Sequence, residues 1–289
     1  RAASLVALLI SFLFITAFMQ TTTAAPLPPE PVEAYLVIQR TFLQEDFREV
    51  AFLAKSFVTD HPHLPETPRV WVWLALSLDR LERVDEALQT LDDLQNQLAA
   101  NDPLWPEVLF WEADISRRAV RMARAKSAYQ QLTQRYAASP WAPRAQLGLG
   151  LSYLSQQAFE IAVKYFHDVA RQEAGSPIAL DARLFEGLCE LRMARFPQAT
   201  ALFQPLLEEL TEPSSVAQAA FYLGESLSGL SQFDEAVAAY RRSLETKENS
   251  QWTRYALFGQ GWAYFRAGRC PESIKVFDRY LAQTALDHR

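Results

Sequence analysis

Small residues recur through this chain at a nearly constant interval of 37 residues, and this periodicity constrains the fold more than any other feature. Each period has two of them, twelve residues apart, and a large apolar residue follows four residues after the second. The first small residues are Ala75, Ala113, Gly150, Gly187, Gly224 and Gly261. The second are Ala87, Ala125, Ala162, Ala199, Ala236 and Ser273, and the apolar residues are Leu91, Tyr129, Phe166, Phe203, Tyr240 and Phe277. Because small residues make up roughly a quarter of ordinary sequence, chance would fill all these places about once in 10⁷ trials.

The residues within a period predict two helices. Apolar residues recur at helical spacing, as in Leu223, Leu227 and Leu230 and then from Phe233 to Leu244. No segment alternates in the manner of a strand. The residues between periods include Pro62, Pro103, Pro140, Pro177 and Pro213, which favour helix ends. One helix pair cannot bury its own apolar face, so the pairs must stack into an all-α solenoid.

The small residues predict where the helices of a pair cross. A small side chain on each helix allows a close approach, and we expect the aromatic residue to fill the space towards the next pair. Gly187 is a representative crossing point. One period further upstream the pattern has decayed to Ile38, Val50 and Ala54, which is typical of a terminal repeat.

The period resembles a known family. Gln146-x₂-Leu149-Gly150-x₂-Tyr153 followed by Ala162-x₃-Phe166 is similar to the tetratricopeptide repeat, W-x₂-L-G-x₂-Y and then A-x₃-F. The resemblance implies a right-handed superhelical solenoid of about seven helix-turn-helix repeats over residues 34–289, cut short at the C-terminal end. The repeat is longer than the usual 34 residues. Its linkers resemble those of the periplasmic outer-membrane-assembly lipoproteins and of the Tol-Pal-associated proteins, although a lipid-attachment cysteine and an N-terminal coiled coil are absent.

The N-terminal residues resemble a targeting segment. Residues 2–19 are almost entirely apolar, Arg1 precedes them, and Thr22-Thr23-Ala24 offers a small-x-small cleavage site. We expect residues 1–24 to be a signal peptide and residues 25–33 to be a proline-rich linker. The apolar run is close to the ~20 residues that span a bilayer, so an uncleaved inner-membrane tether through residues 2–19 is the alternative.

Charge and residue chemistry exclude several functions. The net charge is −6 without a basic tail, which argues against a nucleic-acid partner. The four histidines (His61, His63, His167 and His288) are scattered, and neighbouring acids such as Asp92-Asp93 point apart on a helix. Cys189 and Cys270 fall two repeats apart, so we expect two free thiols. These patterns predict no enzyme, no cofactor and no metal site.

Two sets of residues are candidates for binding. In the related family the fifth and ninth positions of a repeat, counted with the first small residue as the eighth, commonly face a concave groove. The fifth position and the last repeat supply the candidate groove residues Val72, Phe110, Leu147, Leu184, Phe221, Phe258, Trp262 and Phe265. A candidate basic patch for an acidic partner or a lipid headgroup comprises Arg117, Arg118, Arg121 and Arg124. Core packing is the alternative for the apolar set, and an exposed turn is the alternative for the arginines.

The sequence therefore predicts a non-enzymatic scaffold of the bacterial cell envelope that binds a protein or peptide in its groove. The alternative is the non-catalytic arm of a larger envelope enzyme, for example one that acts on peptidoglycan, with its catalytic domain outside these residues.

Overall fold

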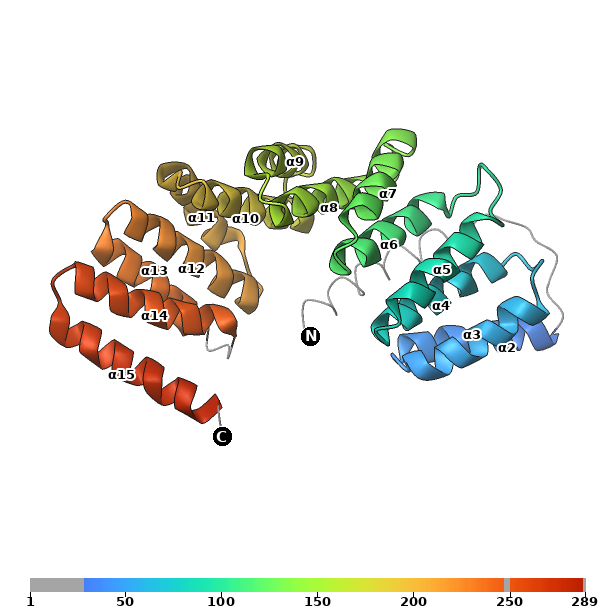
Figure 1. Ribbon diagram of the computed structural model, residues 1–289, viewed down its shortest axis with the longest axis horizontal. Helices are drawn as coiled ribbons and strands as arrows, with labels where there is room; N and C mark the ends of the chain where they lie inside the picture. Colours follow the sequence, from blue (N-terminus) through green and yellow to red (C-terminus); the bar gives the residue numbers. More distant parts are fainter. Residues whose placement is uncertain (1–28, 247–249, 288–289) are drawn as a thin grey trace. The chain divides into compact units, whose positions relative to one another are not determined.

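The computed structural model describes residues 29–246 and 250–287, and these residues form helices and no strand (Figure 1). They belong to two compact lobes, which we treat separately: an N-terminal lobe up to Ala100 and a C-terminal lobe from Asn101. The expected signal peptide lies outside the described residues. None of the described helices has the length and apolarity needed to cross a bilayer.

The described helices form seven consecutive pairs, which agrees with the predicted repeat number. The N-terminal lobe contains α2 (Pro29–Leu43), α3 (Phe47–Asp60), α4 (Thr67–Arg80) and α5 (Val84–Gln95). The C-terminal lobe contains α6 (Trp105–Arg118), α7 (Met122–Arg135), α8 (Ala142–Ser155), α9 (Phe159–Gln172), α10 (Pro177–Arg192), α11 (Phe196–Glu209), α12 (Pro213–Gly229), α13 (Phe233–Glu245), α14 (Gln251–Arg266) and α15 (Cys270–Asp287). In each pair the even-numbered helix is the first helix and the odd-numbered helix is the second.

Prolines act as helix boundaries in two ways. Pro103 and Pro140 lie in linkers, as expected, whereas Pro177 and Pro213 are the first residues of α10 and α12. Proline suits that position because its missing N–H would have no partner in the first turn. The same effect places Pro29 at the start of α2, so the end of the expected linker is helical.

The turn inside every pair has one geometry. A residue with positive φ follows the first helix, and the residue after it donates its N–H to the carbonyl five positions earlier, as Arg83 does to Leu78 at 2.9 Å. This is a Schellman ending. In these seven turns the residues with positive φ are Glu45, Glu82, Val120, Gln157, Ala194, Ser231 and Gly268. Each lies seven residues after the eighth position of its repeat. Glu45 stands in the same relation to Ile38, so the first pair, α2 and α3, follows the same register.

The predicted close crossing points are confirmed. A Cβ atom placed on Gly150 would lie 2.5 Å from the ring of Phe166, and one on Gly187 would lie 2.7 Å from the ring of Phe203. Gly224 and Gly261 stand in the same relation to Tyr240 and Phe277. Each aromatic ring therefore covers the glycine of its own repeat, which the sequence interpretation did not foresee.

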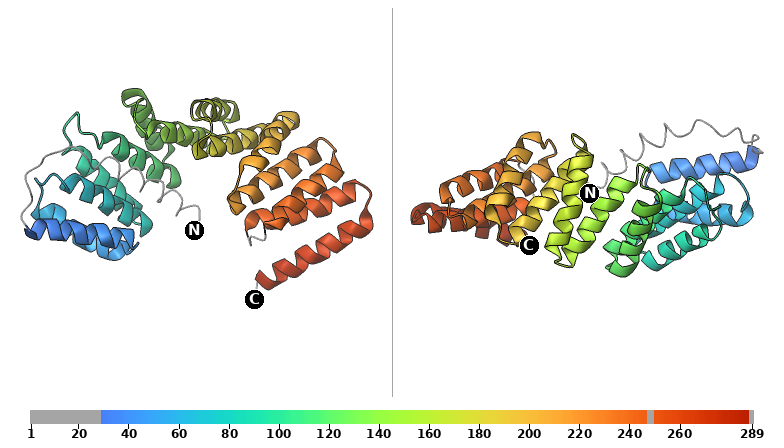
Figure 2. Two further views of the ribbon diagram at one scale, coloured as in Figure 1. Left: turned by 180° about the vertical axis from the view of Figure 1, so that it is seen from behind. Right: turned by 90° about the horizontal axis from the view of Figure 1, so that it is seen from above.

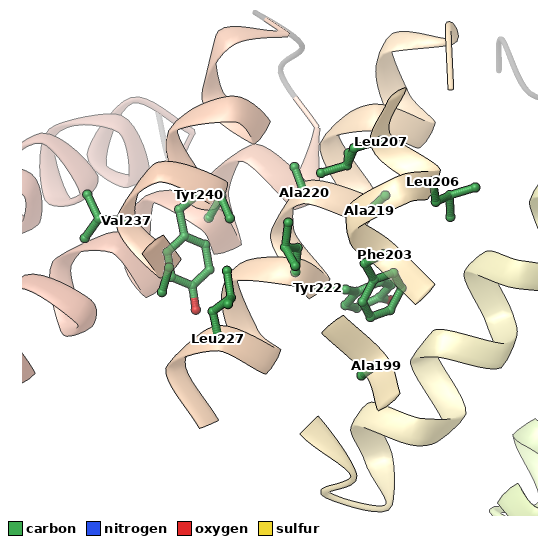
Figure 3. Close-up of a cluster of buried hydrophobic side chains, with 14 of the residues drawn as sticks. Ala199, Phe203, Leu206, Leu207, Ala219, Ala220, Tyr222, Leu227, Val237 and Tyr240 are labelled. Atoms are coloured by element: carbon green, nitrogen blue, oxygen red, sulfur yellow. The ribbon is translucent and has the colours of Figure 1, made fainter. Parts of the chain in front are cut away.

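The aromatic residue also faces the next pair, as predicted. A Cβ on Gly259 would lie 2.7 Å from the ring of Tyr240, which is thus held between glycines of two successive first helices. Where the next pair has an aromatic residue nearby, the two rings pack together. The ring centroids are 5.7 Å apart for Phe166 and Phe185, and also for Phe203 and Tyr222. Figure 3 shows the rings of Phe203 and Tyr222 together in this core.

The two kinds of helix pack differently along the solenoid. First helices contact the next first helix, as α12 does α14 and α2 does α4 within their lobes. Among the described helices, the backbones of the second helices do not pack against one another. Where second helices meet, long side chains make the contact, as Arg242 of α13 does with Glu208 of α11 at 2.8 Å. Figures 1 and 2 show the pairs of the C-terminal lobe side by side in chain order. Second helices are therefore separated by furrows whose floor is the first helix between them.

Candidate functional site

The candidate groove residues are not equally accessible. Val72 and Leu184 are buried, and Phe110, Leu147 and Phe221 are half-buried. These five contribute mainly to the core. Phe258, Trp262 and Phe265 on α14 are exposed, with 44%, 47% and 54% of their surfaces accessible.

The three exposed residues form one continuous surface, which we call the α14 strip. Phe258 and Trp262 have ring centroids 6.3 Å apart, and Trp262 and Phe265 have centroids 5.7 Å apart. One edge of the strip rests on α15, where Phe277 lies 5.9 Å from both Phe258 and Trp262. The rings are thus held against α15 on one side and are exposed on the other within the described residues. A contiguous exposed apolar surface of this kind is typical of a protein-binding site.

The preceding repeat shows what covers an equivalent residue. Phe221 stands one repeat before Phe258, and its ring centroid lies 6.0 Å from Trp252 and 5.8 Å from Tyr255, both in the first turns of α14. Phe110 on α6 is covered in the same way by Trp141, at 5.0 Å, just before α8. In the two repeats whose fifth position is Phe110 or Phe221, aromatic side chains at the start of the next first helix therefore cover that phenylalanine. The sequence interpretation missed these covering residues because they lie just outside the family motif.

The candidate basic patch is largely neutralised within the chain. Asp114 accepts ion pairs from Arg117 at 2.7 Å and from Arg118 at 3.1 Å, and Arg124 pairs with Glu112 at 2.8 Å. Arg121 also has an interaction within the chain. The sequence interpretation overlooked these acids because they precede the arginines in α6. The patch stays a prediction, with less free charge than its composition indicates.

The remaining titratable candidates are accounted for by packing. Both cysteines are free, as predicted, and burial raises the pKa of the Cys189 thiol to about 12, which makes it a poor nucleophile. Nδ1 of His167 lies 3.1 Å from Oε1 of Glu186, whose pKa is raised by burial. Across residues 29–246 and 250–287 no group of His, Cys, Asp and Glu side chains could hold a metal ion.

Comparison with known proteins supports the repeat assignment. The model of a tetratricopeptide repeat family matches residues 48–103, 112–177, 147–209, 186–251 and 229–288. A tetratricopeptide repeat protein from Parabacteroides merdae has a similar fold, with a TM-score of 0.64 at 14% identity over 88% of this chain and 93% of the other. No curated protein sequence matches this chain.

Structures of MamA are similar over part of the chain. MamA from MSR-1 has a TM-score of 0.52 at 17% identity, over 64% of this chain and 99% of its own. A double mutant of MamA from RS-1 has a TM-score of 0.56 at 13% identity, over 66% and 100% of the two chains. These likenesses concern the fold, whereas the family model matches most of the sequence repeat by repeat. The chain belongs to the tetratricopeptide repeat family.

Proposed function

We propose that this protein is a non-enzymatic scaffold of the bacterial cell envelope, and that the α14 strip binds an amphipathic helix of a partner protein. Its repeats point to protein binding as the general role. The observation that supports this particular site is the exposure of Phe258, Trp262 and Phe265 where the preceding repeat has the equivalent fifth-position residue covered by a helix.

The contacts of Phe221 define the chemistry of the partner. Trp252 and Tyr255 are three residues apart, so they stand on one face of the helix that covers Phe221. Ala256 follows and is fully buried, because a small residue lets the helices approach. We infer that the partner presents a helix with an aromatic pair in its first turns and a small residue next to it. Such aromatic anchors commonly dominate the energy of an interface.

The proposal is tested with a helix of known sequence. A labelled peptide of residues 250–266, which contains Trp252 and Tyr255, is titrated with the full chain, and binding is followed by fluorescence anisotropy. Replacing Phe258 and Trp262 with Ser should weaken binding at least about tenfold. Ile161→Ser, which removes an exposed apolar side chain from α9, is the matched control and should leave binding unchanged. A peptide in which Trp252 and Tyr255 are both Ala should bind poorly.

Thermal melting separates a binding surface from a core. If the strip is a surface, the double Ser variant should melt close to the native protein. If the strip packs instead against a further repeat that follows these residues, the variant of the longer protein should lose several kcal/mol of stability, since large-to-small core changes cost about 3–5 kcal/mol each. A sharp loss of stability with the peptide still bound would sink the proposed site.

The envelope location is proposed from residues 2–19 and the small residues that follow them. With an initiating methionine restored, the protein expressed in a bacterium should appear in the periplasmic fraction without its first 24 residues, as judged by mass spectrometry. Intact protein in the inner membrane would favour the tether. Intact protein in the cytoplasm would contradict export.

A further inference from the structure

The N-terminal lobe has an open furrow between the second helices α3 and α5, which we call the α3–α5 furrow. It encloses about 950 Å³. Arg48, Phe52 and Lys55 line it from α3. Leu74 and Leu78 of α4 lie at its floor, and α5 supplies the opposite wall.

Two of the corresponding furrows of the C-terminal lobe, α9–α11 and α13–α15, are bridged by ion pairs at one repeat position. Arg195, just before α11, reaches back to Glu160 on α9 at 3.4 Å. Arg269, just before α15, reaches back to Asp234 on α13 at 3.2 Å. In both cases the arginine precedes a second helix, and the acid lies in the first turn of the preceding second helix. Further along the same furrow, away from the bridge, a cavity of about 560 Å³ lies between Glu245 of α13 and Arg279 of α15.

The α3–α5 furrow has the arginine of this bridge and lacks its acid. Arg83 occupies the repeat position of Arg195 and Arg269, and the position of Glu160 and Asp234 is occupied by Arg48. Arg83 makes a bidentate ion pair with Glu86 of α5, with Nε–Oε1 and Nη2–Oε2 distances of 2.6 and 2.5 Å. Arg269 pairs in a similar way with Glu272 of α15, at 2.9 Å. Arg48 forms no ion pair with the described residues. Within the described residues, no carboxylate therefore occupies the place between Arg48 and Arg83 that Glu160 and Asp234 take in the two bridged furrows.

The surroundings of Arg48 favour a peptide over other anions. Phe52 lies one turn further along α3 with 73% of its surface exposed, and Lys55 follows on the same face. The α5 wall carries Glu86 and Asp93, so the positive charge of the furrow is concentrated on its α3 side, where Arg48 and Lys55 lie. This combination suits a ligand that is acidic on one side and apolar on another.

We propose that the α3–α5 furrow binds an acidic, partly apolar peptide segment of a partner protein. A carboxylate of the segment lies between Arg48 and Arg83, where Glu160 and Asp234 lie in the other repeats. Its apolar side chains contact Phe52 and the α4 floor. Hydrogen bonds between guanidinium groups and carboxylates are among the strongest at protein surfaces, and the apolar contacts add to them.

The test measures binding of a labelled synthetic peptide with Glu on one helical face and Leu on the other, using the full chain at low ionic strength. Arg48→Glu should weaken binding at least about tenfold, because repulsion replaces a charge-assisted bond. Arg40→Glu is the matched control. It makes the same charge change on an exposed residue of α2, outside the furrow, and should change the affinity less than about twofold. Phe52→Ser should also weaken binding, and a peptide with Lys in place of Glu should not bind.

A second measurement exploits the bridge. Arg48→Glu places an acid opposite Arg83, as in the other repeats, so the melting temperature of the full chain should stay level or rise slightly while peptide binding is lost. Unchanged affinity, or an equal loss with Arg40→Glu, would overturn the proposal. So would Arg48-dependent binding of phosphatidylglycerol vesicles without binding of the peptide, because the ligand would then be a lipid surface. The α14 strip variants should leave this binding unchanged, so the two proposed sites can fail separately.

Discussion

The neighbouring pairs α10–α11 and α12–α13 solve the same packing problem in two ways. In both, the aromatic residue of the second helix lies on the glycine of the first, Phe203 on Gly187 and Tyr240 on Gly224. The pairs differ beside the ring. Phe203 meets the ring of Tyr222 in the next pair, whereas Tyr240 lies against Gly259 there.

The ninth position of the repeat follows the same division. Tyr240 donates a hydrogen bond of 2.6 Å to Glu225, and Tyr129 lies 3.4 Å from Oδ1 of Asp114. The repeats of Phe166 and Phe203 have Leu at that position, and the last repeat, with Phe277, has Trp262 there, so none of the three has an acid. A buried tyrosine hydroxyl needs space, which the facing glycine provides, and a hydrogen-bond acceptor, which the carboxylate provides. A phenylalanine ring has no hydroxyl and needs neither. The comparison teaches that acids at the ninth position accept hydrogen bonds from buried tyrosines. They are therefore poor candidates for residues that recognise a partner.

The largest expected effect breaks the feature that both pairs share. Gly187→Leu puts a side chain where the ring of Phe203 lies 2.7 Å from a Cβ position, and the rigid helix crossing leaves the ring no room to move. We expect a loss of about 3 kcal/mol in the free energy of unfolding, measured in urea. Gln204→Ala, an exposed change on α11, should stay within about 0.5 kcal/mol. Equal effects would mean that the repeat frame is wrong.

The fold could be predicted from the sequence because every repeat carries the same small and aromatic positions. The aromatic positions also predicted contact with the next pair. The double role of Tyr240 could not be foreseen, because the ring bridges residues 16 positions before it and 19 after it, and only coordinates show which neighbour it meets. The candidate site was predicted less well. Repeat position alone cannot distinguish Phe221 from Phe258, since their accessibility depends on what the next helix covers.

A second prediction tests whether the phenylalanine pair tolerates a hydroxyl. Phe203→Tyr should cost about 2 kcal/mol, because Tyr222 fills the space beside the ring and Leu188 offers no acceptor. The measurement is urea unfolding of the full chain. Phe277→Tyr in the last pair, whose residue is half-buried and beside exposed α14 rings, is the control and should cost less. An unchanged free energy of unfolding for Phe203→Tyr would show that the core is less tightly packed than the ring contacts indicate.

A third prediction uses alkaline pH. Burial, and then the nearby Glu225 carboxylate, raise the pKa of Tyr240 well above its ordinary value of 10. Below pH 10 this tyrosine is protonated in both the folded and the unfolded chain, so its stabilisation is complete. Above pH 10 only the unfolded chain ionises, and stability should fall by about 1.4 kcal/mol per pH unit. Urea unfolding between pH 9 and 11 should therefore show a shallower decline for Tyr240→Phe than for the native chain, and an identical decline would contradict the burial of the hydroxyl.

The smallest expected effect comes from converting one kind of pair into the other. Tyr240→Phe alone should cost about 1 kcal/mol, since Glu225 loses its hydrogen bond and Ser228, 3.3 Å from the hydroxyl, loses a second contact. Glu225→Leu alone should cost a similar amount, because the buried hydroxyl loses its charged acceptor. The double variant has the Phe and Leu of the α10–α11 pair and should lie within about 0.5 kcal/mol of the native chain, since removing both polar partners leaves none unsatisfied. A double-mutant cycle in urea measures this coupling, and Tyr240→Phe combined with the distant Gln204→Ala should be simply additive. If the costs of Tyr240→Phe and Glu225→Leu also add, the recurring pairing of tyrosine with an acid has no energetic basis, and the ninth position is again open to a role in binding.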